Sequence, residues 1–555
     1  MVSSLPPPSP RPVVTAVPLE SPKNNVNSKS DIQQTVVNNS IILPTPISNN
    51  NNNNNAIPVP IEVDVRRKRF PTDRAYFMAK ELLMTERTYK KDLEVIDVWL
   101  REEVGKEESC SELEPLNSLI NLVSPLLQFH TVLLREVDQR LATWEGRSNA
   151  HLKGNYQRIG DVLLRNMTLL PLYESYIAHH RVVLEALDLA LRQSRRLMTL
   201  HRDFEAQKVC YLPLSALSLK PLHRLLHYDR LLDRLTNHYG PQHPDYADCM
   251  EAKQKLSTLV QRLPAELRAS EGWAQLSELR RHVAGCGEVL AGRQQFLRQG
   301  CLMKLSRKGF QQRLFLLFSD VLLYCSRCVP TNGNSLVGSQ QEFKVHGQLP
   351  LRGLLVEDSE ERQGAQFCIT LASRGRVTIA AASSAEERER WVQAIITAIK
   401  DAENSGSFSP VLSACSSSDE VLPGSEEMPS PQTPQKAVTS TQRSNTSVHV
   451  CWHRGASLGL DDQLRAVENQ LSGFLLRKFK NSNGWQKLWV VFTNFCLFFY
   501  KTFQDDAPLA SLPLLGYSVS CPEDKDAIAK DYVFKLQFKT HVYFFRAESE
   551  YTFGR

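Results

Sequence analysis

Five basic or titratable side chains recur at helical spacing within the segment from Leu212 to Tyr246. They are Lys220, His223, His227, Arg230 and Arg234, at steps of three and four. Residues at this spacing lie on one face of an α-helix. Ammonium, imidazole and guanidinium groups bind carboxylates, so the pattern predicts a cationic ridge that faces solvent or an acidic partner. Periodicity alone favours a solvated face, because most charged helix faces are solvated.

The same segment carries an apolar stripe on another helical face. Its members are Pro221, Leu225, Tyr228, Leu232, Leu235 and Tyr239. Pro221 can open a helix, because the amide it lacks would be unpaired in the first turn, and Gly240 followed by Pro241 can close it. The stripe must be buried against neighbouring helices, so we expect the ridge to belong to a helical bundle.

A carboxylate interrupts a second apolar stripe nearer the N-terminus. The stripe consists of Leu82, Glu86, Tyr89, Leu93, Ile96 and Leu100. Its steps of four and three describe a long amphipathic helix that begins near Asp73. Carboxylates are rarely buried alone, so the pattern favours a Glu86 that lies at the bundle edge or pairs with an arginine over one kept for an outside contact.

Further helices are predicted over residues 114–144, 155–167, 171–208 and 245–298, the last of them interrupted near Pro264 and Gly272. Tyr173 and Tyr176 fall on one side of their segment, so we expect them in the core.

Composition excludes several classes of protein. The 555 residues carry a net charge of only +6 without a zinc-finger or RNA-binding signature, so we expect no nucleic-acid partner. The twelve cysteines are mostly scattered, as in a reducing compartment, and Cys325 and Cys328 lack a second pair to complete a zinc site. We therefore expect no metal and no cofactor. No run approaches the ~20 apolar residues that span a bilayer, which favours a cytoplasmic protein.

The hydrophobic period changes from helical to alternating at Gly300. Seven strands are predicted, over residues 300–305, 313–318, 321–324, 343–345, 351–356, 366–371 and 376–381. A helix should follow, because Ser384 and Glu387 form a capping box ahead of the stripe of Trp391, Ile395 and Ala398.

A second strand-rich unit begins near Leu471. Its last predicted strand, residues 541–546, is followed by only nine residues, Ala547 to Arg555, so we expect no C-terminal helix. The open end of the unit would then expose apolar side chains, and the unit should be unstable or take a cover from elsewhere in the chain.

Three stretches of the helical part resemble the signature regions of Dbl-homology domains. They are AKELLMTERTYKKDL from Ala79, LLPLYESYI from Leu169, and KPLHRLLHY from Lys220 with the later HPDY from His243. Both strand-rich units resemble pleckstrin-homology domains. This order is similar to the C-terminal half of the FERM, RhoGEF and pleckstrin domain-containing proteins, without their FERM domain.

The resemblance implies a multidomain fold with an all-α Dbl-homology bundle and two pleckstrin-homology β-sandwich or barrel domains, the second lacking its C-terminal helix. The expected boundaries are a disordered Pro/Asn-rich tail (1–65), the Dbl-homology domain (66–297), the first pleckstrin-homology domain (298–400), a disordered linker (401–465) and the truncated second pleckstrin-homology domain (466–555).

The resemblance also implies a guanine-nucleotide exchange factor for Rho-family, Rac-type GTPases, which speeds GDP release without covalent chemistry. By the family pattern Glu86 would engage switch I, Lys220 would lie on the GTPase-binding surface, and Arg224 would brace the bundle. The family usually has glutamine at His223 and leucine at Arg230. These departures keep open the alternative of a non-catalytic cytoskeletal or membrane-associated adaptor with a degenerate bundle.

The pleckstrin-homology resemblance implies contact with phosphoinositides through clustered cations. The candidates are Lys304, Arg307, Lys308 and Arg313 in the first unit, and Lys478 and Lys487 in the second. Both clusters match the lipid-binding pattern only partly, so we expect weak membrane contact and a cytoplasmic protein that is peripheral at the plasma membrane. These modules could also cover the GTPase-binding face and regulate it.

Overall fold

The computed structural model describes residues 74–108, 110–145, 157–286, 294–328, 342–359, 361–404, 445–479 and 484–555. The predicted tail over residues 1–65 lies outside them. Everything below concerns the compact unit that begins at Arg67. No helix in the described part of this unit is long and apolar enough to cross a membrane.

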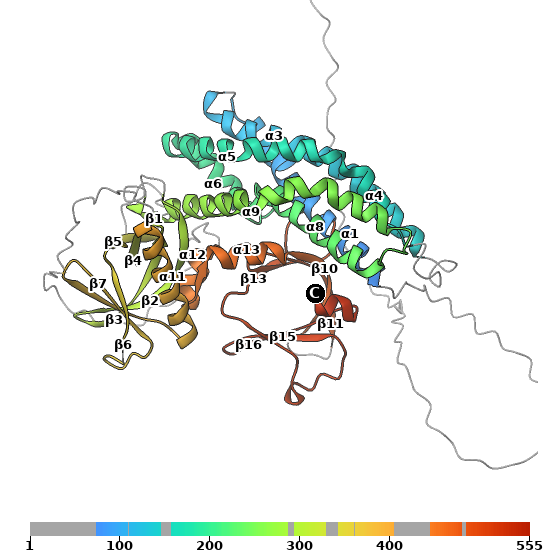
Figure 1. Cartoon of the computed structure of the whole chain (residues 1–555). Helices are drawn as coiled ribbons and strands as arrows, with labels where there is room; N and C mark the ends of the chain where they lie inside the picture. The colour runs from blue at the N-terminus through green and yellow to red at the C-terminus, as the bar shows by residue number, and fades with distance from the viewer. Residues whose placement is uncertain are drawn as a thin grey trace, which may run out of the picture. The chain divides into compact units, whose positions relative to one another are not determined.

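The first half of the unit is a bundle of helices (Figure 1). They are α1 (Arg74–Glu94), a π-helical turn (Val95–Leu100), α2 (Arg101–Gly105), α3 (Glu114–Trp144), α4 (Gly160–Arg165), α5 (Leu170–Gln193), α6 (Arg195–Ala206), α7 (Leu214–Leu217), α8 (Lys220–Tyr239) and α9 (Tyr246–His282). Two short 3₁₀ turns, Ser111–Leu113 and Asn166–Leu169, join them. Helix α3 packs on α5 and α8 packs on α9, so each of these four helices buries an apolar face against its neighbour.

The predicted stripes are the buried faces of α1 and α8. Leu82, Leu93 and Ile96 are almost completely buried, and so are Leu225 and Leu232. Tyr173 and Tyr176 lie in the core, as predicted.

Several helix boundaries differ from the prediction. The helix expected over residues 155–167 spans only Gly160–Arg165, and the one expected to reach residue 298 ends at His282. The segment expected as one helix over residues 171–208 breaks at Ser194, whose extended backbone and side-chain hydroxyl cap α6 by accepting from the Leu197 amide. The helix expected to be interrupted near Pro264 and Gly272 runs unbroken through both and ends at His282. Packing of α9 along α8, α4 and α5 outweighs the hydrogen bond that the proline removes.

Seven strands and a helix follow, as predicted. The strands are β2 (Phe296–Ser306), β3 (Gly309–Phe318), β4 (Val321–Arg327), β5 (Phe343–Pro350), β6 (Leu355–Ser359), β7 (Cys368–Ser373) and β8 (Arg376–Ala381). They pair in the order β5-β4-β3-β2-β8-β7-β6, with the two-residue strand β1 (Val283–Ala284) beside β5. Helix α11 (Ala385–Asn404) begins where the Ser384 hydroxyl accepts from the Glu387 amide, and it buries Trp391 and Ile395.

The second strand-rich unit has its own sheet. Its strands are β10 (Leu471–Lys478), β11 (Trp485–Thr493), β12 (Cys496–Tyr500), β13 (Ala510–Pro513), β14 (Ser518–Ser520), β15 (Val533–Phe538) and β16 (His541–Arg546). The prediction that nothing helical follows is wrong in one respect, because a five-residue helix, α14 (Glu550–Gly554), begins where Ser549 accepts from the Thr552 amide.

The linker predicted over residues 401–465 is also partly wrong. Residues 445–465 are ordered as α12 (Ser447–Arg454), β9 (Ser457–Gly459) and the start of α13 (Leu460–Glu468). Strand β9 pairs with β2, and Val448 and Leu460 lie in the core cluster at the junction of α9 and the first sheet. Polar composition suggested a flexible chain, but a few apolar side chains at the right spacing suffice to bury this stretch.

Gly300 allows this close approach. It faces Ser457 across the β2–β9 pair, where an added Cβ would lie 2.2 Å from the serine Cβ. We predict that Gly300→Val lowers the free energy of unfolding by about 1–3 kcal/mol and makes residues 445–468 sensitive to protease. The control is Gly105→Val, because a Cβ there would meet no atom within 4 Å. Unchanged protease protection in Gly300→Val would contradict the prediction.

Candidate functional site

Glu86 lies at the centre of the contact between α1, α3 and α8, and none of its surface is exposed. The Arg224 guanidinium donates to its Oε2 over 3.0 and 2.5 Å, and the Tyr228 hydroxyl donates to the same oxygen over 2.7 Å. On the other side His130 Nδ1 lies 2.6 Å from Oε1. The carboxylate is therefore paired with an arginine, which is one of the two arrangements that the sequence favours.

These partners decide the ionisation of Glu86. Burial by itself would raise its pKa, but the charges of Arg224 and His130 and the hydrogen bonds to the carboxylate lower the pKa to about 2. Arg224 also donates to the Thr85 hydroxyl over 2.8 Å, so it fastens α8 to two consecutive residues of α1. The ion pair is thus a structural bond between the two helices that form the site.

Lys220 lies at the N-terminal end of α8 and is only 3% exposed. Its ammonium donates to Gln470 Oε1 over 3.0 Å and to Thr493 Oγ1 over 2.6 Å. Burial lowers the pKa of Lys220, and the charge of Asp92 on α1 opposes that shift. The ridge therefore does not face solvent at this end. The Lys220 ammonium is hydrogen-bonded instead by neutral side chains that lie 250 and 273 residues further along the chain.

The described residues among 460–479 and 484–555, which comprise α13 and the second strand-rich unit, meet the rest of the ridge as well; we call them the cover. Arg230 donates to the Glu468 carbonyl over 3.0 Å and pairs with its carboxylate at 2.6 Å. His223 lies 3.0 Å from the Gln470 side-chain nitrogen through Nδ1 and 2.7 Å from Glu271 of α9 through Nε2. The prediction of a solvated ridge is wrong, because its partner is another part of the same chain.

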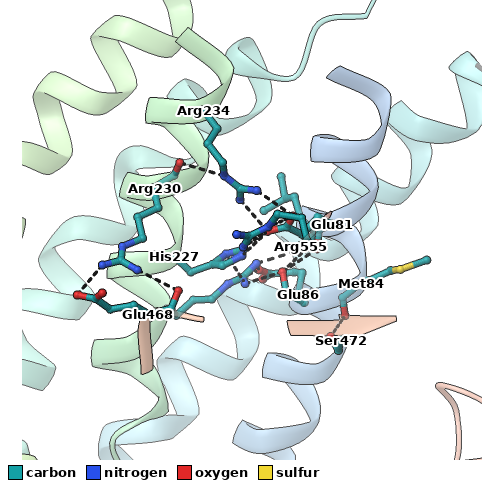
Figure 2. Close-up of polar contacts among 12 residues, drawn as sticks. Glu81, Met84, Glu86, His227, Arg230, Arg234, Glu468, Ser472 and Arg555 are labelled. Atoms are coloured by element: carbon teal, nitrogen blue, oxygen red, sulfur yellow. Dashed lines mark hydrogen bonds and ion pairs between the residues drawn. The ribbon is translucent and has the colours of Figure 1, made fainter. Parts of the chain in front are cut away.

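The end of the ridge converges on a second buried carboxylate, Glu81 of α1 (Figure 2). Arg234 donates to both oxygens of Glu81 over 2.7 and 2.9 Å, and Arg555 of the cover lies 3.2 Å away. Tyr551 also donates to Glu81, over 3.0 Å. Burial lowers the pKa of His227, which faces Glu81, to about 4, and the neighbouring Arg224 reinforces this.

The cover also touches α1 directly. Ser472 donates to the Met84 carbonyl over 3.0 Å, which Figure 2 shows beside the Glu81 contacts. Lys91 donates to the Asp505 carbonyl, and the Arg87 guanidinium lies 4.1 Å from the centre of the Phe503 ring. Both helices of the site are thus in contact with the cover.

Apolar packing accompanies these polar contacts. Alternate residues of β11 and β12 belong to the same core cluster as the helical bundle: Trp489, Val491, Cys496, Phe498 and Tyr500. The alternate set, which includes Leu488, Val490 and Phe499, forms the core of the second sheet itself. The helical bundle therefore covers the outer face of this sheet, while the predicted instability of the isolated unit stays a prediction.

The structure brings the predicted residues to one side of the bundle. Lys220 and Arg224 line one groove together with Thr85 and Asp92 of α1, and Arg224 links this groove to Glu86. Four polar neighbours of the predicted residues escaped the sequence interpretation: Glu81, Glu271, Gln470 and Thr493. Only Glu81 carried a signal, because it lies on the helix of Glu86; the others come from distant segments without a motif.

The six predicted lipid-binding residues lie in different surroundings. Arg307 and Lys308 occupy the exposed turn between β2 and β3, whereas the Lys304 ammonium lies 5.0 Å from the Tyr324 ring centre and Arg313 donates to Gln311. Lys478 lies on β10. Lys487 pairs with Glu548 at 3.0 Å.

Residues 78–263 match the family of RhoGEF domains, and residues 296–400 and 469–553 match the family of PH domains. The mouse FERM, ARHGEF and pleckstrin domain-containing protein 2 is 51% identical over 498 residues, which are 88% of this chain and 46% of the mouse protein. Protein 1 of the same name from chicken is 50% identical over 501 residues, 89% of this chain and 47% of the chicken protein. The chain thus spans about half the length of these relatives.

Solved structures resemble parts of the chain. The crystal structure of the DH domain of FARP2 is 48% identical and covers 38% of this chain and 97% of its own, with a TM-score of 0.35. The complex of the PDZ-RhoGEF DH/PH domains with activated RhoA is 15% identical and covers 59% of this chain and 94% of its own, with a TM-score of 0.32.

The buried ion pair can be tested by unfolding experiments. We predict that Arg224→Leu lowers the free energy of unfolding by about 3–5 kcal/mol, because Glu86 then keeps a buried charge without its guanidinium. The double variant Glu86→Leu/Arg224→Leu should recover most of that loss, as apolar replacements of buried pairs often do. Urea unfolding followed by circular dichroism measures both. Equal destabilisation by the single and the double variant would contradict the proposed pairing.

Proposed function

The chain belongs to the FERM, ARHGEF and pleckstrin domain-containing proteins, and from this premise we propose that it is a guanine-nucleotide exchange factor for a Rho-family GTPase, of the Rac type. The observation that carries the proposal is that α1 and α8 of the RhoGEF domain bring together the Glu86–Arg224 pair and Lys220, with Arg224 and Lys220 lining one groove. The reaction is the release of GDP, and no covalent bond is made or broken. The partner is the GTPase; no metal or cofactor of the chain is required.

The mechanism follows from thermodynamic linkage. A protein that binds the nucleotide-free GTPase more tightly than the GDP-bound form lowers the affinity for GDP by the same factor. In the proposed complex Glu86 engages switch I, Lys220 lies on the binding surface, and Arg224 holds Glu86 and α8 in place. Glu86 must then exchange some of its present partners for the GTPase, and the groove lined by Thr85 and Thr88 of the same helix lies beside it.

We further propose that the described conformation is a closed state. Lys220, His223, Arg230 and Arg234 all bond to the cover, and Met84 on α1 lies under Ser472. A GTPase and the cover would compete for these groups, so exchange requires the cover to leave. Regulation by the second PH domain is the consequence.

The alternative is an adaptor that keeps the bundle but does not bind a GTPase productively. One observation favours it: the Glu86 carboxylate is completely buried, and each oxygen already has a partner. Exchange measurements separate the two functions, because an adaptor would stay inactive even with the cover displaced.

Contact with anionic lipid remains part of the proposal. Arg307 and Lys308 in the exposed turn are the best placed of the candidates, whereas Lys487 would have to leave Glu548, which also pairs with Lys80 of α1. Weak phosphoinositide contact would hold a cytoplasmic protein peripherally at a membrane.

Displacing the cover should raise the exchange rate. An added Cβ on Gly473 would lie 3.0 Å from the Met84 sulfur, so we predict that the bulky Gly473→Trp forces β10 away from α1. The release of fluorescent GDP from Rac-type and other Rho-family GTPases should then rise about tenfold or more over the unmodified chain. Glu86→Ala or Lys220→Ala in this background should return the rate to that of GTPase alone.

The matched control is Gly105→Trp, which adds the same side chain where nothing lies within 4 Å and should exchange like the unmodified chain. If Gly473→Trp releases the cover but accelerates no GTPase, the adaptor function stands and the exchange function falls.

A further inference from the structure

The hydrogen bonds of Gln470 have a fixed direction. A lysine ammonium only donates, so the Gln470 atom that lies 3.0 Å from Lys220 Nζ must be the carbonyl oxygen. The amide nitrogen then faces His223 Nδ1, also at 3.0 Å. An amide nitrogen only donates, so Nδ1 must accept and cannot carry a proton.

The other side of the ring leads to the same assignment. The Glu271 carboxylate lies 2.7 Å from His223 Nε2 and only accepts when ionised, so Nε2 carries the proton. Two neighbours on opposite sides of the imidazole, one on α9 and one on the cover, thus select the neutral ring with its proton on Nε2.

We propose that His223 makes closure of the GTPase-binding face sensitive to pH, and that Glu271 is the positioning residue that turns its Nδ1 toward the cover. The inference rests on the proposed function and adds its regulation: protonation of His223 releases Gln470, and nucleotide exchange increases on acidification.

Protonation leaves no satisfactory arrangement of Gln470. A proton on Nδ1 would point at the amide nitrogen, donor against donor. Turning the amide around would satisfy His223 but would place its nitrogen against the Lys220 ammonium, which would keep only Thr493 as acceptor. Either arrangement loses a buried hydrogen bond and brings two like charges to one amide, so the cover binds the neutral ring better.

The surrounding charges agree with this direction. On α8 itself Lys220, Arg224 and His227 are near, α9 contributes Glu271 and Glu278, and α1 contributes Asp92. The described cover residues that line the groove beside Lys220 and Arg224, and those that line the neighbouring groove beside Glu271 and Glu278, are uncharged. Burial lowers the pKa of His223; Glu271 opposes this, and Lys220 reinforces it.

The sign of the pH effect follows from linkage. In the released state the imidazole regains water and titrates near its ordinary pKa of about 6.5, whereas in the closed state its pKa is lower. The closed state is therefore most stable above that ordinary pKa and loses stability as the pH falls through it. One linked proton changes the ratio of released to closed chain by at most about tenfold per pH unit.

The test compares the full-length chain with His223→Gln between pH 8 and pH 6. A glutamine can still donate to Glu271 and accept from Gln470, but it does not titrate. We expect GDP release by the unmodified chain to rise several-fold on acidification, up to about tenfold, and the rise to be lost in His223→Gln. His179→Gln, on the exposed face of α5, is the matched control and should keep the rise. A rise that persists in His223→Gln would overturn the proposal.

Glu271→Gln tests the positioning role. Its amide oxygen can still accept from Nε2, but it lacks the charge that favours the imidazolium ion, so the midpoint of the pH profile should move to lower pH. Glu271→Leu should weaken closure at every pH, and Glu271→Gln should restore it. An unmoved midpoint in Glu271→Gln would contradict the role of Glu271.

A second readout does not depend on exchange. Hydrogen–deuterium exchange of peptides from α8 and β10, corrected for the intrinsic effect of pH on amides, reports release of the cover directly. If release follows pH and needs His223 while no GTPase is accelerated, the proposed function fails and the pH-sensitive contact stands. If the chain accelerates GDP release but the release of the cover is independent of pH, the pH-sensitive contact is refuted and the proposed function stands.

Discussion

A carboxylate that is shielded from water needs hydrogen-bond donors from the protein. Glu86 is such a carboxylate, and its position constrains how the helices of the bundle pack. Arg224 answers from α8 and His130 from α3, so three helices that are far apart in the chain can pack in only one way around it. The apolar stripes supply most of the stability, because they bury many more atoms. The ion pair supplies the alignment, since a helix that rotated or slid would leave a buried charge alone.

The same constraint acts a second time on the outer face of α8. Lys220 and His223 are too near the interior to be fully hydrated, and among the described residues of the bundle Glu271 and the more distant Asp92 carry the charges that favour their protonated forms. Gln470 and Thr493 complete their hydrogen bonding from the cover. A face whose polar groups need partners from outside the bundle can bind either a GTPase or the cover, and the same groups of α8 would make both sets of contacts.

Elements with a strong local signal could be predicted from the sequence. The stripe around Glu86, the limits of α3 and α8 and the seven strands of the first sheet follow from periodicity and capping, which act over a few residues. Ser194 was missed because a single capping residue resembles many serines inside helices. The order in residues 445–465 was missed because it depends on contacts with β2 and α9 rather than on local composition.

The candidate site divides in the same way. Glu86, Lys220 and Arg224 could be named from motifs. The spacing of four places Lys220 and Arg224 on one face of their helix, whereas the nearness of Glu86 was expected only from the family resemblance. Their partners could not: Gln470 lies 250 residues beyond Lys220, and no spacing rule connects them. Periodicity alone therefore favoured a solvated ridge, which is the most frequent outcome for such a face but not the one that this chain adopts.

The balance between the two kinds of contact decides how readily the cover can leave. Each polar contact contributes only about 0.5–1.5 kcal/mol net, because water replaces the lost partner on release. Release would cost more free energy at the apolar faces of β11 and β12, because Trp489 and Phe498 would become exposed to water. Because α12 and β9 anchor the cover close to the bundle, rebinding is intramolecular and even a modest interface stays closed. The polar contacts of the ridge then determine how the cover docks, while the apolar contacts supply most of the binding free energy. A change of one hydrogen bond on the ridge therefore shifts the equilibrium between docked and released cover without abolishing docking.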